Sequence, residues 1–219
     1  VVSGAADLWD GAGASHSAYL GMLASPPLTM PAGGRALDDL IRAPAGSIVY
    51  LDLETTGLRS TPLFLVGLMY SEGDDLVLDQ LFARDYTEEI AVLSFVSGML
   101  QKRELLVTFN GNTFDVPFLV DRMTFHRLPA VIPRRHLDLL PVSRSMMKGR
   151  TPNHRLQTLE RFVLGRKRTG DIPGSEIPGA YHEYVRTGDA RRMAAVIHHN
   201  RLDLLSMMEL ITVYLGGRL

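Results

Sequence analysis

The stretch Ser47-Ile48-Val49-Tyr50-Leu51-Asp52-Leu53-Glu54-Thr55-Thr56-Gly57-Leu58 predicts a buried strand that ends in two acids. Its first half is apolar and rich in β-branched residues, which is typical of a strand covered on both faces. Side chains two positions apart on a strand point to the same face, about 7 Å from each other, so Asp52 and Glu54 project together. Two adjacent anions favour a bound cation, although acids at a solvated strand edge are the alternative. The glycine that follows would let a substrate backbone approach closely, which favours the first interpretation.

The composition bounds the kinds of protein that this chain can be. With 219 residues, 46% hydrophobic and 21% charged, it has material for one main globular domain. The absence of cysteine excludes disulfides and thiolate zinc sites. No apolar run approaches the roughly 20 residues of a membrane span and no secretion signal opens the chain, so we expect a cytoplasmic protein without membrane contact. The first residue is Val1, which is compatible with a piece of a longer protein that has further domains.

The chain divides into two parts by composition. Residues 1–46 are rich in Gly, Ala, Ser and Pro and have few apolar residues spaced to bury a face. They predict a loosely ordered extension, with one short helix around residues 35–41. Residues 47–219 are expected to form the functional domain.

The order of predicted elements indicates a mixed α/β fold. Apolar runs at 62–70 and 75–82 flank a Gly-Asp turn and predict a hairpin, which forms an antiparallel meander with the strand at 48–53. A helical pattern over 87–100 and a strand at 105–109 follow. By analogy, this βββαβ order resembles a ribonuclease H-like fold, with a mixed five-stranded sheet, first an antiparallel meander and then parallel strands, flanked by helices.

Two more acids occur where they can join the first pair. Asp115 follows the Asn110-Gly111 turn and begins a helix, where an acid is also favoured simply by the helix dipole. Ligand sites of open α/β sheets form beyond the strand ends, so this carboxylate can reach Asp52. In the last helix, Asp203 interrupts an apolar face, and a buried acid needs a partner.

Basic residues concentrate in one segment. Residues 122–168 contain twelve Lys and Arg and only two acids, a net charge of +10, while the remainder of the chain carries −11. Beside an acidic metal centre, such a segment predicts a track for a polyanion, with Arg134, Arg135, Arg166 and Lys167 as candidate phosphate contacts. A solvated charged face is the alternative.

Taken together, the motifs resemble the DEDD superfamily of 3′-to-5′ exonucleases, and more closely the bacterial YprB-like group. The matching pieces are Leu51 to Leu58, Phe109-Asn110-Gly111 with Phe114-Asp115, and His199-Asn200 with Asp203. The stretches Leu156-Gln157-Thr158-Leu159-Glu160 and Asp171-Ile172-Pro173-Gly174 are similar to the linker of the same group. The resemblance covers residues 47–215.

The resemblance implies hydrolysis of phosphodiester bonds by a two-metal mechanism. Asp52, Glu54, Asp115 and Asp203 would hold two divalent cations, Mg²⁺ or Mn²⁺. The implied substrate is DNA or RNA, entering as a single-stranded end, and its contacts would include Thr55, Thr56, Gly57, Leu58, Asn110, Asn112 and Phe114. A non-catalytic nucleic-acid-binding module and a phosphodiesterase acting on small nucleotides remain as alternatives.

The general base would be one of two neighbouring histidines. In one continuous helix, His199 shares a face with Asp203, four residues later, whereas His198 does not. A helix that begins at Asn200 would instead leave His198 in a loop from which it can turn inward. The motif favours His199.

Overall fold

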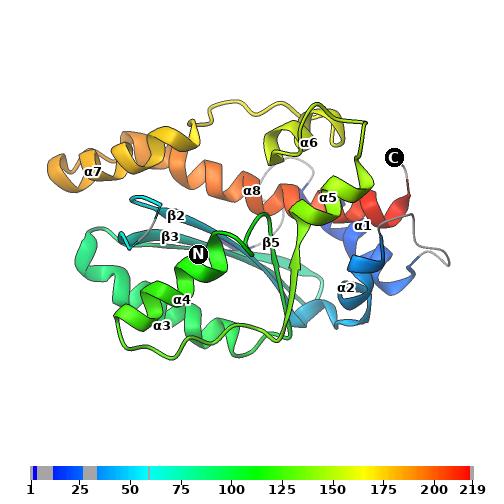
Figure 1. Cartoon of the computed structure of the whole chain (residues 1–219), viewed down its shortest axis with the longest axis horizontal. Helices are drawn as coiled ribbons and strands as arrows, with labels where there is room; N and C mark the ends of the chain where they lie inside the picture. The colour runs from blue at the N-terminus through cyan, green and yellow to red at the C-terminus, as the bar shows by residue number, and fades with distance from the viewer. Residues whose placement is uncertain (1, 4–11, 27–33, 59, 218–219) are drawn as a thin grey trace.

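The computed structural model describes residues 2–3, 12–26, 34–58 and 60–217 (Figure 1). Its strands are β1 Val2–Ser3, β2 Ile48–Thr55, β3 Leu63–Glu72, β4 Asp75–Phe82, β5 Leu105–Thr108 and β6 Arg135–Asp138. Its α-helices are α1 Ala12–Ala24, α2 Asp38–Arg42, α3 Glu89–Leu100, α4 Asp115–Phe125, α5 Leu139–Met146, α6 Leu156–Phe162, α7 Ile177–Thr187 and α8 Arg191–Gly216. Among the described residues, no helix is long and apolar enough to cross a membrane.

The sheet is mixed, with strand order β1-β4-β3-β2-β5-β6. Strand β2 pairs antiparallel with β3 and parallel with β5, so that Tyr50 lies opposite Val107. Strand β6 extends the parallel half. The five strands β2 to β6 confirm the predicted ribonuclease H-like sheet, to which β1 adds a two-residue edge.

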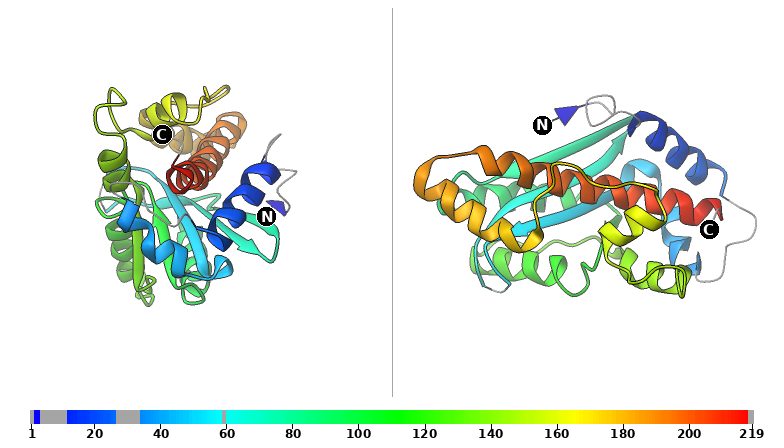
Figure 2. Two further views of the ribbon diagram at one scale, coloured as in Figure 1. Left: turned by 90° about the vertical axis from the view of Figure 1, so that its right-hand side faces the viewer. Right: turned by 90° about the horizontal axis from the view of Figure 1, so that it is seen from above.

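Helices cover both faces of the sheet. Helix α8 crosses one face and lies beside α1, while α3 and α4 pack on the opposite side (Figures 1 and 2). Alternation along β2 divides its side chains between two hydrophobic clusters: Tyr50 packs on the α8 side, and Leu51 and Leu53 on the α3 and α4 side. Asp52 and Glu54 share the parity of Tyr50, so both acids face α8.

The elements predicted from sequence are found close to their expected positions. The hairpin β3–β4, the strand β5 and the helix that begins at Asp115 are all confirmed. Helix α2 with the 3₁₀ turn before it, Gly34–Leu37, confirms the short helix expected around 35–41.

The described part of the N-terminal stretch is more ordered than its composition predicts. Helix α1 packs against α8 and buries Tyr19, which is 2% exposed. The imidazole of His16 lies 3.0 Å from the Ser71 hydroxyl of β3. The prediction of a loose extension is therefore wrong for residues 12–24, because a few well-placed buried side chains anchor a Gly- and Ala-rich helix to the sheet.

Candidate active site

Strand β2 carries two carboxylates, those of Asp52 and Glu54, on the face that α8 covers. Asp52 and Glu54 are half-buried, and the register of β2 against β3 shifts between Glu54 and Thr55. Such a bulge ends regular pairing and bends the strand, which turns the following residues out of the sheet. The predicted pair of acids therefore lies at the end of β2, where its regular pairing with β3 stops.

Asn200 of α8 connects the helix to this end of the sheet. Its amide Nδ2 donates to the Asp52 carboxylate Oδ2 at 2.8 Å, and its Oδ1 accepts from Nε2 of Gln80 on β4 at 2.8 Å. The close approach requires a glycine in β3, because a Cβ at Gly67 would lie 2.3 Å from Asn200 Oδ1. Asn200 is fully buried and thus fixes the height of α8 above Asp52.

Asp115 and Asp203 approach the β2 acids from two helices. Asp115 is the first residue of α4 and is 5% exposed. Burial raises the pKa of Asp115 to about 7, although its own backbone N–H and that of Leu53 oppose the shift. Burial also raises the pKa of Asp203, opposed by the positive charge of Arg168 and by His199.

The four carboxylates repel one another. Burial is the largest cause that raises the pKa of Asp52, followed by the charges of Asp203, Glu54 and Asp115. For Glu54, burial is again first, and Asp203 and Asp115 follow. The structure therefore brings together all four acids that the sequence nominated, in a region with excess negative charge.

Arg168 supplies positive charge inside this acidic region. Its guanidinium is 6% exposed and makes two hydrogen bonds to the Glu160 carboxylate, from Nε at 2.6 Å and from Nη2 at 2.5 Å. It also donates to Asp203, and from Nη1 to Asp171 at 3.2 Å. Because Glu160 is 1% exposed, Arg168 is held from one side and presents its remaining N–H groups to Asp203 and Asp171.

The two candidate histidines have different surroundings. Helix α8 runs without a break through Asn200, so the alternative helix start there is wrong. His199 Nδ1 donates to Asp171 Oδ1 at 2.7 Å, and its Nε2 lies 3.8 Å from Asp203 Oδ2. His198 Nδ1 instead accepts from Arg201 at 2.7 Å. Of the two rings, His199 is the one next to the acidic residues.

The donor set suits a hard divalent cation. All four acids offer oxygen, the ligand that Mg²⁺ and Mn²⁺ prefer, and their raised pKa values show a need for added positive charge. Within the part of the chain that the structure describes, no three His, Asp or Glu side chains converge closely enough to form a ready ligand cage. Asp203 is turned toward Arg168 instead.

Asp138 organises the loop between β5 and α4. It caps α5 by accepting from the Leu140 N–H at 3.0 Å and also accepts from the backbone N–H groups of Asn110 (2.8 Å) and Asn112 (3.1 Å). Asn110 has a positive φ of 67°, which asparagine tolerates better than most residues. The loop that precedes Asp115 is thereby held near the ends of β5 and β6, with the Asn112 side chain exposed.

The loop after β2 uses its hydroxyls internally. Thr55 donates to the Gly57 carbonyl at 2.7 Å and Thr56 to the Pro62 carbonyl at 3.0 Å, and both threonines are buried. Leu58 is 82% exposed and lines, with Phe114, a pocket of about 260 Å³. Of this loop, Leu58 and the backbone of Gly57 are thus better placed for substrate than the two hydroxyls.

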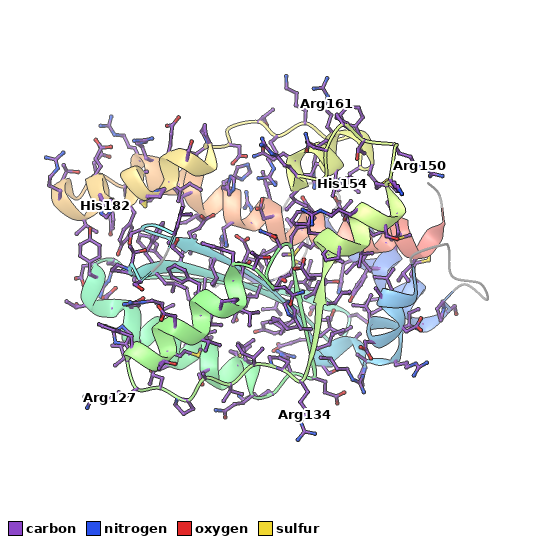
Figure 3. All side chains as sticks on the ribbon, viewed as in Figure 1. Arg127, Arg134, Arg150, His154, Arg161 and His182 are labelled. Carbon is purple, nitrogen blue, oxygen red and sulfur yellow. The ribbon has the colours of Figure 1, made fainter. Side chains whose placement is uncertain are left out.

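The basic residues chosen from the sequence do not form one track. Arg166 makes an ion pair with Glu209 at 3.1 Å and donates to Ser206. Arg135 is the first residue of β6, at the opposite end of this strand from Asp138. Its Nε lies 3.8 Å from Oδ1 of Asp39. Figure 3 shows Arg134 on the side of the molecule opposite Arg161 of α6. Of the four, only Lys167 is both exposed and next to Arg168 in the chain.

Sequence reasoning did not identify what two residues, Asn200 and Arg168, do in the site. Asn200 occupies a buried stripe with Val196 and Leu204, and a lone amide at helical spacing between apolar residues would have been a signal. Nothing local separates Arg168 from its basic neighbours, because only packing against Glu160 makes it different.

The family is shown by residues 49–215, which match the RNase_H_2 family of the RNase_H superfamily, so the chain belongs to this superfamily. A relative, Uncharacterized protein YprB of Bacillus subtilis (strain 168), is 32% identical over 170 residues, which cover 75% of this chain and 41% of that protein. The chain therefore spans less than half the length of that relative. The family B DNA polymerase from the hyperthermophilic archaeon Pyrobaculum calidifontis shares the fold, with a TM-score of 0.60 and 16% identity over 74% of this chain and 24% of the polymerase.

Proposed function

We propose that residues 47–219 form a metal-dependent nuclease of the DEDD type that removes nucleotides from the 3′ end of DNA or RNA. The observation that carries the proposal is the gathering of Asp52, Glu54, Asp115 and Asp203 from β2, α4 and α8. Burial raises the pKa of each acid, and the charge of Asp203 raises the pKa of the other three further. Membership of the ribonuclease H superfamily supports a nuclease-like function. The polymerase neighbour supports nucleic acid as the substrate.

In this proposal, the four acids would hold two divalent cations, Mg²⁺ or Mn²⁺. When bound, these ions supply an activated water and stabilise the leaving oxygen of an in-line displacement at phosphorus. The protein contributes the base: His199 would take the proton of the attacking water at Nε2, because its Nδ1 donates to Asp171. Arg168 would keep Asp203 oriented by a charge-assisted hydrogen bond.

The test is hydrolysis of 5′-labelled DNA and RNA oligonucleotides with Mn²⁺ and with EDTA. We expect a ladder of products shortened from the 3′ end that requires the cation and is lost in Asp52→Asn. The matched control is Asp74→Asn, an exposed acid in the turn between β3 and β4, at the end of these strands away from Asp52, which should retain activity. Cleavage by Asp52→Asn equal to that of the parent would contradict the proposal.

Circular single strands distinguish the direction of cutting, because an enzyme that needs a 3′ end leaves them intact. Metal-dependent cleavage of circles would support a nuclease, but one that cuts internally and not from the 3′ end. Turnover of nucleotides but not of polymers would indicate a small-nucleotide phosphodiesterase.

A further inference from the structure

A cleft of about 560 Å³ opens directly beside the acidic residues. Asp52 and Asp203 line it, together with Arg144 of α5 and Arg155, the residue before α6. Its volume lies within the usual range of sites for nucleotide-sized ligands, which is roughly 300 to 1,000 Å³. One cleft thus joins the site carboxylates to two guanidinium groups.

Among the residues that the structure describes, neither arginine has a competing acidic partner. Both side chains are exposed, and neither forms an ion pair with any residue in the described ranges. By contrast, Arg135, Arg166 and Arg168 all have acidic partners. Positive charge without an acidic partner near a cleft favours a ligand with phosphate groups, which Arg binds with two parallel hydrogen bonds.

The rest of the lining suits an unpaired nucleotide. Phe109, Leu140 and Leu156 provide an apolar surface, and Asn110 and Asn153 provide amides. His154 joins them between α5 and α6 (Figure 3), with a buried Nε2 that has no partner among the described residues. Aromatic and apolar contact with bases, combined with cations for the backbone, is how single strands are bound without a fixed sequence.

We infer that this cleft is the binding site for the terminal nucleotides of a single strand, with Arg144 and Arg155 on its phosphates. The inference rests on the proposed function, and it replaces the single basic track that was expected from the sequence with two arginines of this cleft. The end of the strand lies at Asp52 and Asp203, which line the same cleft as the two arginines.

The test measures binding without turnover. Anisotropy of 5′-fluorescein single-stranded DNA and RNA 10-mers is followed in EDTA at several salt concentrations, with Arg144→Glu/Arg155→Glu beside the parent. We expect affinity at 0.1 M salt to fall about tenfold or more and the log–log salt slope to fall by about 1.4, since each lost single-strand contact is worth about 0.7. Arg144→Lys/Arg155→Lys should retain the slope.

The matched control is Arg127→Glu/Arg134→Glu, which makes the same change in net charge at exposed positions remote from the cleft (Figure 3). The inference is overturned if both charge reversals weaken binding equally, if the slope does not change, or if the parent binds no single strand at 50 mM salt. Equal affinity of the parent for a blunt duplex would overturn the choice of a single strand. Because no cation is present, failure of hydrolysis with intact cleft-dependent binding would count against the proposed nuclease alone.

Discussion

The substitution Asp115→Asn tests whether the acidic residues are held together at a cost in free energy. Burial raises the folded-state pKa of Asp115 from 3.8 to about 7. A raised carboxyl pKa means that the folded state prefers the neutral form, so the penalty is absent below about pH 4. It grows as the pH rises to about 7 and is constant above that. Asparagine cannot ionise and therefore escapes the penalty at every pH.

The size of the effect follows from the shift. At about 1.36 kcal/mol per pKa unit, the raised pKa of Asp115 costs the metal-free protein about 4 kcal/mol at pH 8, where the carboxyl is ionised, and about 2 kcal/mol at pH 5, where the folded protein must hold it protonated. The amide is nearly the same size and retains one oxygen to accept from the backbone N–H groups. The unfolding free energy of Asp115→Asn, relative to the parent, should therefore rise by about 2 to 3 kcal/mol between pH 5 and pH 8.

Urea unfolding in EDTA at both pH values measures this difference. Asp121→Asn on the exposed face of α4 is the control and should show a difference near zero at both. Added Mn²⁺ should stabilise the parent more than Asp115→Asn, because binding to the folded state adds stability by mass action. A relative stability of Asp115→Asn that stays constant or falls with pH would refute the reasoning.

Two other substitutions test the placement of α8. His199→Ala should lower the maximal hydrolysis rate about hundredfold and remove one limb of the pH–rate profile, while His198→Ala should remain close to the parent; the reverse result would make His198 the base. Gly67→Ala would place a Cβ 2.3 Å from Asn200 Oδ1 and 2.7 Å from Leu204 Cδ1, so it should cost about 1 to 3 kcal/mol and lower Tm by several degrees. An unchanged melting curve would show that α8 does not approach β3 this closely.

Local periodicity was sufficient for much of the fold. The strand that ends at Asp52 and Glu54, the hairpin that follows and the helix that begins at Asp115 depend on patterns within a few residues, because alternation and helix starts are short-range effects. Strand β6, at the edge of the sheet, had no such pattern. It has only four residues and becomes a strand by pairing with β5.

The composition of the N-terminal stretch was misleading because, as for β6, contacts with distant elements decide its structure. Low average hydrophobicity predicts disorder, but a helix needs only a few anchors when a large surface is ready to receive them. Tyr19 and His16 provide those anchors.

By itself, the sequence determined the four acids, their order and the face of β2 from which the first two project. Only the tertiary structure decided what surrounds them: Asn200 reaches Asp52 across 148 positions of the chain, and Arg168 reaches Asp203 across 35. It also separated the basic segment into ion-paired, remote and cleft-lining residues. Charge and polarity are properties of a residue, but whether a charge is paired, buried or available depends on the packing of distant elements, which no local pattern records.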